Sequence, residues 1–205
     1  MTKIRIGIIA AAFVLLAGLA AFSWYQTLTG PRMVTSEIDP NARQLGGAFI
    51  LTDQNGRTVD ESILKGKWTA VFFGYTYCPD ICPLTLQSLA RTKAAMGDKA
   101  KDLQIVFISV DPARDTPANL KAYLESGGFP KGVIGLTGTQ SQIDAVTKAY
   151  GATAIKKGDA DSYTFNHTSI VYLMDPKGNY NSVLTEDLPP EKSAKMVREI
   201  MRSPY

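Results

Sequence analysis

The sequence predicts an α/β fold in which helices flank both faces of a mixed β-sheet. From Trp68 to Gly151, patterns of buried strands alternate with helical patterns. Such alternation is typical of strand-helix-strand units, whose strands run parallel. A hairpin pattern on either side of this region adds antiparallel strands, because short strand-like segments there flank turns that contain glycine.

The first expected elements are a hairpin and a buried strand. Residues 49–52 and 57–59 are short strand-like segments, and Asn55-Gly56 between them supplies the positive φ angles of a tight turn. Residues 69–75 form a largely apolar run, which predicts a buried strand. A helix is expected next, from about Pro83 to Met96.

The second half of the domain begins with another buried strand at residues 103–110. In the turn that follows, Asp115 and Thr116 are expected to cap a helix that begins at Pro117. The later expected elements are the rest of this helix to residue 124, a strand at 133–137, a helix at 141–150, a hairpin of 169–174 and 180–184, and a helix at 189–202. This order resembles that of thioredoxin-like proteins, and ligands of such open sheets bind beyond the carboxyl ends of the strands.

The N-terminal segment predicts a membrane anchor. Lys3 and Arg5 precede residues 6–25, which carry no charge and approach the roughly 20 apolar residues that span a bilayer. The positive-inside rule then places the N-terminus in the cytoplasm and the rest of the chain on the periplasmic or equivalent outer side of the inner membrane. A cleaved signal peptide is the alternative, because residues 18–20 offer a small-x-small site. The apolar run is, however, longer than the roughly 7 to 15 residues of the hydrophobic region of a signal peptide, and it continues past that site.

Three regions are therefore expected: a cytoplasmic tip and single-pass transmembrane anchor at 1–30, a tether at 31–45, and a thioredoxin-like domain at 46–205. Two of the 22 Lys and Arg residues of the chain, and none of its 19 Asp and Glu residues, lie within 1–30. The remainder is therefore nearly neutral. Nucleic-acid binding needs a basic surface, so the charge balance argues against a nucleic-acid partner and leaves small ligands or a protein partner.

Cys78 and Cys82 are the only cysteines, and they follow the buried strand at residues 69–75. Residues four apart share a helix face, so both sulfurs can approach the same point. The amino end of a helix also favours the thiolate form. Two thiolates are suitable ligands for copper, but the same pair could instead cycle as a disulfide.

The chain has one histidine, His167, which precedes the expected strand at 169–174. The start of that strand is expected to face the cysteines, so the imidazole becomes a candidate third ligand. Zinc competes with copper for such donors, but a structural zinc site usually takes four protein ligands and no fourth is evident. Asp111, which ends a strand at the same sheet edge, is a candidate for orienting His167, with a role in the turn as the alternative.

Three segments together resemble the Sco/SenC family: 75–85 (YTYCPDICPLT), 108–117 (ISVDPARDTP) and 166–178 (NHTSIVYLMDPKG). Members of this family are membrane-anchored, thioredoxin-like copper proteins that help to assemble the copper centre of cytochrome c oxidase. The resemblance covers roughly residues 46–200. It implies that Cys78, Cys82 and His167 bind copper as Cu(I) or Cu(II), and that the partner is cytochrome c oxidase subunit II or another copper-acquiring protein.

The leading hypothesis is therefore a copper chaperone, which is not an enzyme. The alternative is a membrane-tethered thiol-disulfide reductase that keeps the recipient's cysteines reduced. Two departures from thioredoxin-type reductases weaken this alternative: three residues rather than two separate Cys78 and Cys82, and no proline lies at 166–169, where the fold resemblance implies one. A copper or redox sensor is a third hypothesis.

Overall fold

The computed structural model describes residues 18, 20, 45–126, 128–159, 162–184 and 188–202. The chain divides into two units, Met1–Asp39 and Pro40–Tyr205, and the described fold belongs to the second. The expected anchor and tether lie outside the described residues, apart from residues 18, 20 and 45. Within the described part of the chain, no helix is both long and apolar enough to cross a membrane.

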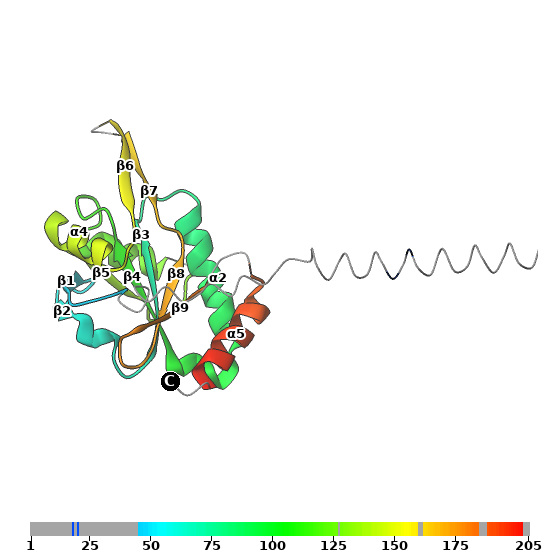
Figure 1. Ribbon diagram of the computed structural model, residues 1–205. Coiled ribbons are helices and arrows are strands. Elements are labelled where there is room, and N and C mark those ends of the chain that lie inside the picture. Colours follow the sequence, from blue (N-terminus) through cyan, green and yellow to red (C-terminus); the bar gives the residue numbers. More distant parts are fainter. Residues whose placement is uncertain are drawn as a thin grey trace, which may run out of the picture. The chain divides into compact units, whose positions relative to one another are not determined.

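A mixed seven-stranded sheet in the order β2-β1-β5-β4-β3-β8-β9 forms the centre of the domain (Figure 1). β3, β4 and β5 are parallel, whereas the outer strands pair antiparallel with their neighbours. The strands of this sheet are β1 (Ile50–Asp53), β2 (Thr58–Asp60), β3 (Trp68–Gly74), β4 (Leu103–Ser109), β5 (Ile134–Thr137), β8 (Val171–Met174) and β9 (Tyr180–Leu184). Each matches an expected strand, so the predicted mixed sheet is confirmed.

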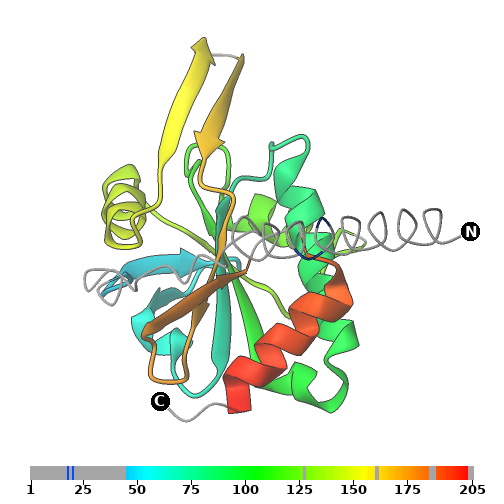
Figure 2. The ribbon, with the colours of Figure 1, turned by 45° about the vertical axis from the view of Figure 1, so that its right-hand side comes forward.

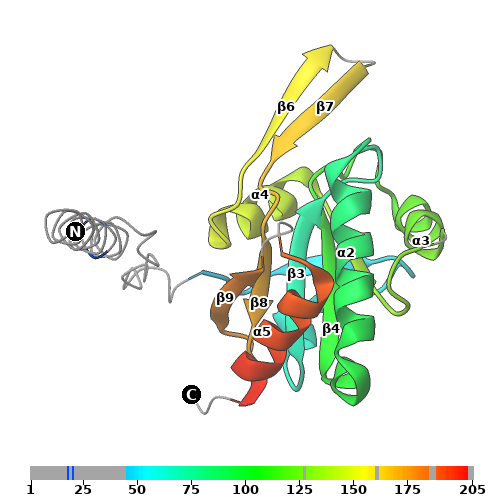
Figure 3. The same ribbon diagram turned by 90° about the vertical axis from the view of Figure 1, so that its right-hand side faces the viewer.

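The helices of the described domain also follow the expected order. They are α2 (Ile81–Ala95), α3 (Pro117–Glu125), α4 (Gln140–Ala149) and α5 (Pro190–Arg202), with short 3-10 helices η2 (Glu61–Leu64) and η3 (Gly97–Asp102). α2 and α5 lie side by side (Figure 3). α3 begins as predicted, because the Thr116 hydroxyl accepts the N–H of Asn119 and Pro117 occupies the first turn. α2 begins at Ile81, about two residues earlier than expected, which places Cys82 in its first turn.

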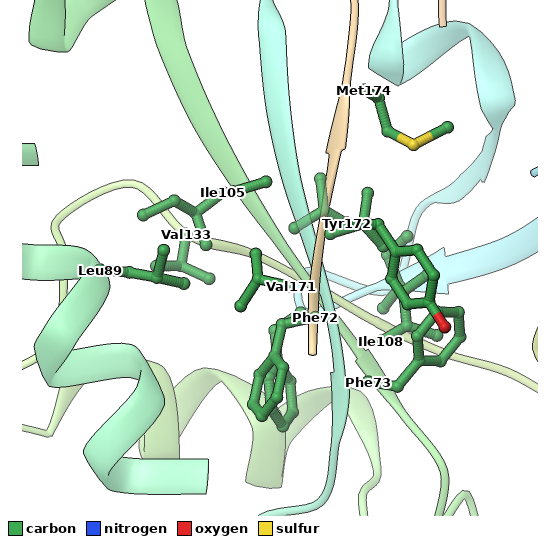
Figure 4. Packing of buried hydrophobic residues seen from close by; sticks show 14 of the residues in the cluster. Phe72, Phe73, Leu89, Ile105, Ile108, Val133, Val171, Tyr172 and Met174 are labelled. Carbon is green, nitrogen blue, oxygen red and sulfur yellow. The ribbon is translucent and has the colours of Figure 1, made fainter. Parts of the chain in front are cut away.

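The core has two halves, one on each face of the sheet. Neighbouring residues of a strand point to opposite faces. Phe72 packs against Phe107, whereas Phe73 packs against Tyr150 and Tyr172. Figure 4 shows Phe72 and Phe73 on opposite sides of the strands. Both faces of β3 are therefore covered, which explains why every residue of this strand is buried and reads as an apolar run.

A second, two-stranded sheet was not predicted. β6 (Ala154–Asp159) and β7 (Ser162–His167) pair antiparallel and form a hairpin that projects from the main sheet (Figure 2). β6 is mostly exposed and rich in polar residues, so it lacks the apolar signal of a strand. β7 does carry a usable signal, because Tyr163, Phe165 and His167 alternate with exposed residues at a period of two.

Candidate metal centre

The loop after β3 and the first turn of α2 carry the two cysteines. Cys78 lies in the loop, where its N–H donates to the Tyr75 carbonyl (3.2 Å). Asp80 occupies the N-cap position of α2, but its side chain accepts no capping hydrogen bond. Instead, the Cys82 N–H donates to the Cys78 sulfur (3.4 Å). The Cys78 sulfur thus satisfies one of the amide groups that the start of a helix leaves unpaired.

Three donor atoms from three different elements meet at this corner. His167 is the last residue of β7, and its Nε2 lies 3.4 Å from the Cys82 Sγ. The ligand atoms of Cys78, Cys82 and His167 all lie within 4.8 Å of one another. Donors about 2.0 to 2.3 Å from one ion are roughly 3.5 to 4 Å apart in a trigonal site, so small side-chain movements would bring the three donors to a common point.

The backbone fixes the tautomer of the imidazole. His167 Nδ1 lies 3.0 Å from the Thr168 carbonyl oxygen, which can only accept a hydrogen bond. Nδ1 therefore carries the proton, and the lone pair of Nε2 faces the sulfurs. The Phe72 and Tyr75 rings pack against the imidazole in T-shaped arrangements, with centroids 6.2 and 5.7 Å away, and limit its rotation.

The two thiols differ in acidity. The pKa of Cys78 lies well below its usual value, chiefly because the Cys82 side chain hydrogen-bonds to its sulfur, and backbone N–H groups add to the effect. The same hydrogen bond raises the pKa of Cys82, and so does burial. These opposite shifts favour ionisation of Cys78 before Cys82. Both cysteines are free, and a metal that binds both sulfurs would displace the Cys82 proton.

Gly74, the last residue of β3, makes room for the buried sulfur. A Cβ at this position would lie 2.7 Å from the Cys82 Sγ and 2.7 Å from a carbon of the Phe107 ring. Both distances are shorter than van der Waals contact. Any larger residue would therefore push the sulfur away from the end of the strand.

Asp115 is not a helix cap, contrary to the prediction; Thr116 alone caps α3. Asp115 is fully buried and turns toward the cysteine loop. Its carboxylate accepts the N–H and the hydroxyl of Thr76 (3.0 and 2.6 Å) and the hydroxyl of Ser109. It therefore ties the loop that carries Cys78 to the end of β4, a role that the sequence position did not reveal.

Asp111 also differs from the expectation that it orients His167. Its carboxylate accepts hydrogen bonds from the Tyr163 hydroxyl (2.9 Å) and from Arg114 Nε. The partner of His167 Nδ1 is instead the Thr168 carbonyl. Asp111 thus contacts the far end of β7, four residues from the imidazole, because the unpredicted hairpin places Tyr163 beside it.

The chain is similar in sequence to known proteins over about three quarters of its length. A profile described as SCO1/SenC matches residues 38–202. The chain is 41% identical over 155 residues to protein SenC of Rhodobacter capsulatus, covering 75% of this chain and 69% of that protein. It is 40% identical over 159 residues to the mitochondrial protein SCO2 of Saccharomyces cerevisiae, covering 76% of this chain and 52% of the yeast protein. The match thus spans about half the length of that yeast relative.

Solved structures agree with these matches. The copper-bound structure of ScoI from Bradyrhizobium japonicum is similar with a TM-score of 0.70 and 43% sequence identity, covering 76% of this chain and 99% of the other. The thioredoxin-like α/β architecture predicted from the order of elements is therefore confirmed. The likeness seen in three short segments extends over the whole domain.

Proposed function

This chain belongs to the SCO1/SenC family, and we propose that it is a copper chaperone whose Cys78, Cys82 and His167 bind one copper ion and deliver it to cytochrome c oxidase. The observation that carries the proposal is the convergence of two sulfurs and one imidazole nitrogen within 4.8 Å. The copper bound in the similar ScoI structure supports the choice of metal.

The chemistry of the donors favours copper over other metals. Soft thiolates select Cu(I), and an imidazole lone pair makes Cu(II) acceptable as well. A structural zinc site would need a fourth protein ligand. Among the described residues, no other histidine, cysteine or carboxylate joins the three. The site therefore suits three-coordinate copper as either Cu(I) or Cu(II).

Unequal burial of the ligands suits a site that must release its cargo. Cys82 is fully buried, whereas Cys78 and His167 are half-buried. An incoming donor of the recipient therefore meets the copper from the side of Cys78 and His167. Ligand exchange begins there, and Cys82 is the last donor to leave.

The recipient in this proposal is cytochrome c oxidase subunit II or another copper-acquiring protein. The domain would act on the outer side of the inner membrane, held by a single-pass anchor within residues 1–30 and a tether at 31–45. The apolar run after Lys3 and Arg5 supports the anchor, and family membership supports the recipient.

Thiol-disulfide reduction is a second candidate, because the unequal acidity of the two cysteines favours it. The Cys78 thiolate would attack a recipient disulfide to form a mixed disulfide and release one recipient thiolate. The Cys82 thiolate, once its proton has been lost, would then attack the Cys78 sulfur. This second step leaves the recipient with two thiols and the chain with a Cys78–Cys82 disulfide.

Replacing His167 with alanine separates the two candidates. Copper delivery needs the imidazole, so we expect His167→Ala to weaken Cu(II) binding by at least about 100-fold, as second-shell losses alone reach 10- to 100-fold. Loading of copper into the recipient should fall in parallel. Reduction of a recipient disulfide needs only the sulfurs and should stay near the rate of the unaltered chain. The measurements are copper titration, recipient loading and thiol release.

Asn166→Ala is the matched control, because Asn166 precedes His167 on β7 and its side chain is exposed. It should leave all three readouts unchanged. If the His167→Ala variant and the unaltered chain load the recipient with equal amounts of copper, the proposal that copper is delivered through this site is wrong. If reduction supports oxidase assembly in that variant, the reductase becomes the better account.

A further inference from the structure

We propose that Arg114 is a positioning residue for His167, which it serves by fastening the β6–β7 hairpin to the cysteine loop. The inference deepens the proposed function, since it takes His167 to be a copper ligand. Arg114 lies in the loop between β4 and α3, and its side chain is 23% exposed. Among the described residues, it contacts neither the sulfurs nor the imidazole. It reaches the site through β7 and through Tyr75, whose ring centroid lies 5.8 Å from the guanidinium carbon and which packs on His167.

The guanidinium of Arg114 joins three segments. In its own loop, Nε donates to Asp111. On β7, Nη1 donates to the Tyr163 carbonyl (3.2 Å), and the guanidinium carbon lies 3.7 Å from the centroid of the Tyr163 ring. In the cysteine loop, the Tyr77 ring centroid lies 4.6 Å from the same carbon. A cation that contacts aromatic rings of two segments and is held by a carboxylate is a strong local attachment.

A row of aromatic side chains connects this attachment to the imidazole. Tyr163, Phe165 and His167 lie on the same face of β7. The ring centroids of Tyr163 and Phe165 are 5.7 Å apart, and Phe165 packs on Tyr75 at 5.4 Å. Tyr75 in turn packs on His167 at 5.7 Å, and its hydroxyl oxygen accepts the N–H of Phe165 (3.2 Å). A displacement of the Tyr163 ring would therefore displace the neighbouring rings in turn, and with them the His167 imidazole.

The hairpin has few other attachments that could fix its position. It pairs with no strand of the main sheet among the described residues (Figure 2). At its base, Thr153 and Thr168 hydrogen-bond to each other. A pocket of about 360 Å³ is lined in part by Phe165 of the hairpin and by Ile143 of α4. β7 is therefore held to the rest of the domain mainly by contacts on this side, those of Tyr163 with Arg114 and Asp111 and that of Phe165 with Tyr75.

Arginine suits the attachment of the hairpin better than lysine would. One nitrogen of the guanidinium, Nη2, is buried and has no hydrogen-bond partner in the described structure. Such a group is tolerated where a planar cation lies against aromatic rings. A lysine would keep the charge but would lose both the planar stacking and the paired contacts to Asp111 and Tyr163. Arg114→Lys should therefore rescue only part of the effect of Arg114→Gln.

The first test uses the full chain without copper, so that it does not depend on the proposed function. In Arg114→Gln, backbone amides of residues 162–167 should exchange with solvent roughly tenfold faster by mass spectrometry. His167 is the only histidine, so its imidazole resonances report on this site alone. They should shift and broaden in Arg114→Gln, while exchange in β3 and β4 stays unchanged.

Arg57→Gln is the matched control. Arg57 also pairs with a buried aspartate, Asp53, but it does so in the turn between β1 and β2. It should leave the hairpin and the imidazole signals unchanged. If Arg114→Gln does not fold, Tyr163→Leu removes the same attachment from the hairpin side. Unchanged exchange and unchanged imidazole signals in a folded Arg114→Gln or Tyr163→Leu variant would overturn the inference.

The second test measures copper binding. Arg114→Gln should weaken Cu(II) binding by roughly tenfold, with a smaller loss for Cu(I), because an outer residue that orients a ligand typically contributes 10- to 100-fold. A variant with a loosened hairpin but unaltered Cu(II) binding would contradict the positioning role. If the unaltered chain binds no copper, the proposed function fails, whereas the copper-free measurements still decide whether Arg114 holds His167 in place.

Discussion

Replacing Cys82 with serine is expected to abolish tight copper binding. A serine hydroxyl is a hard donor that stays protonated at neutral pH, whereas Cu(I) prefers soft thiolates. Cys82 is also the fully buried member of the pair, and its sulfur contacts the His167 imidazole. Its loss leaves one thiolate and one imidazole as the only donors of this site among the described residues. We expect the affinity for Cu(I) to fall by at least about a thousandfold, which competition with a Cu(I) chelator would measure.

The companion variant Cys78→Ser should lose copper binding to a similar extent. Because Cys78 accepts the Cys82 N–H at the start of α2, hydrogen exchange along α2 must be compared with that of the unaltered chain. Ser88→Ala, a change elsewhere on α2, controls for effects on the helix. Retention of one tightly bound copper ion in a folded Cys82→Ser variant would contradict the proposed ligand set.

Of the substitutions proposed for this chain, Asp115→Ala should produce the largest loss of folding stability. The change removes the acceptor for three donors, the Thr76 N–H, the Thr76 hydroxyl and the Ser109 hydroxyl. These groups are buried or partly buried, so each donor left without a partner adds a desolvation cost. We expect the free energy of unfolding to fall by about 3 kcal/mol or more, measured by urea denaturation.

A second test of the role of Asp115 compares how the stability of the unaltered chain and of Asp115→Asn depends on pH. Burial raises the pKa of Asp115 above its ordinary value of 3.8, although hydrogen bonds from Ser109 and Thr76 act in the opposite direction. A raised pKa means that the native state holds the proton more tightly than the unfolded chain does. The contribution of this group to stability is then greatest below pH 3.8 and is lost as the pH rises through the native pKa.

Asp115→Asn cannot titrate, so this decline should be absent from its stability profile. Arg57→Gln, which alters an ion pair in the turn between β1 and β2, should keep the decline. An Asp115→Ala variant as stable as the unaltered chain would show that the Asp115 contacts do not hold the cysteine loop.

The elements that position the cysteines could be predicted from sequence because each has a strong local signal. The strand before Cys78 is covered on both faces and reads as an apolar run, and the Thr116-Pro117 pair marks the start of α3. The spacing of Cys78 and Cys82 was informative for a different reason. It brings both sulfurs to one end of α2, even though only Cys82 lies within the helix.

The environment of His167 could not be predicted in the same way, because it depends on contacts between distant segments. β6 has the polar composition of a loop, and only its pairing with β7 makes it a strand. Asp111 and Asp115 look alike in sequence, both lying in the turn before α3. Their partners, Tyr163 and Thr76, are 52 and 39 residues away, so no local pattern assigns one to the hairpin and the other to the cysteine loop.

X-ray absorption spectroscopy at the copper edge, on the full chain loaded with one equivalent of Cu(I), tests the central claim most directly. The proposed site predicts a first shell of two sulfur atoms and one imidazole nitrogen. Any copper that the weakened Cys82→Ser variant still binds should show a smaller sulfur contribution, and the imidazole contribution should disappear in His167→Ala. A first shell without sulfur, or one that is unchanged in these variants, would contradict copper binding by Cys78, Cys82 and His167.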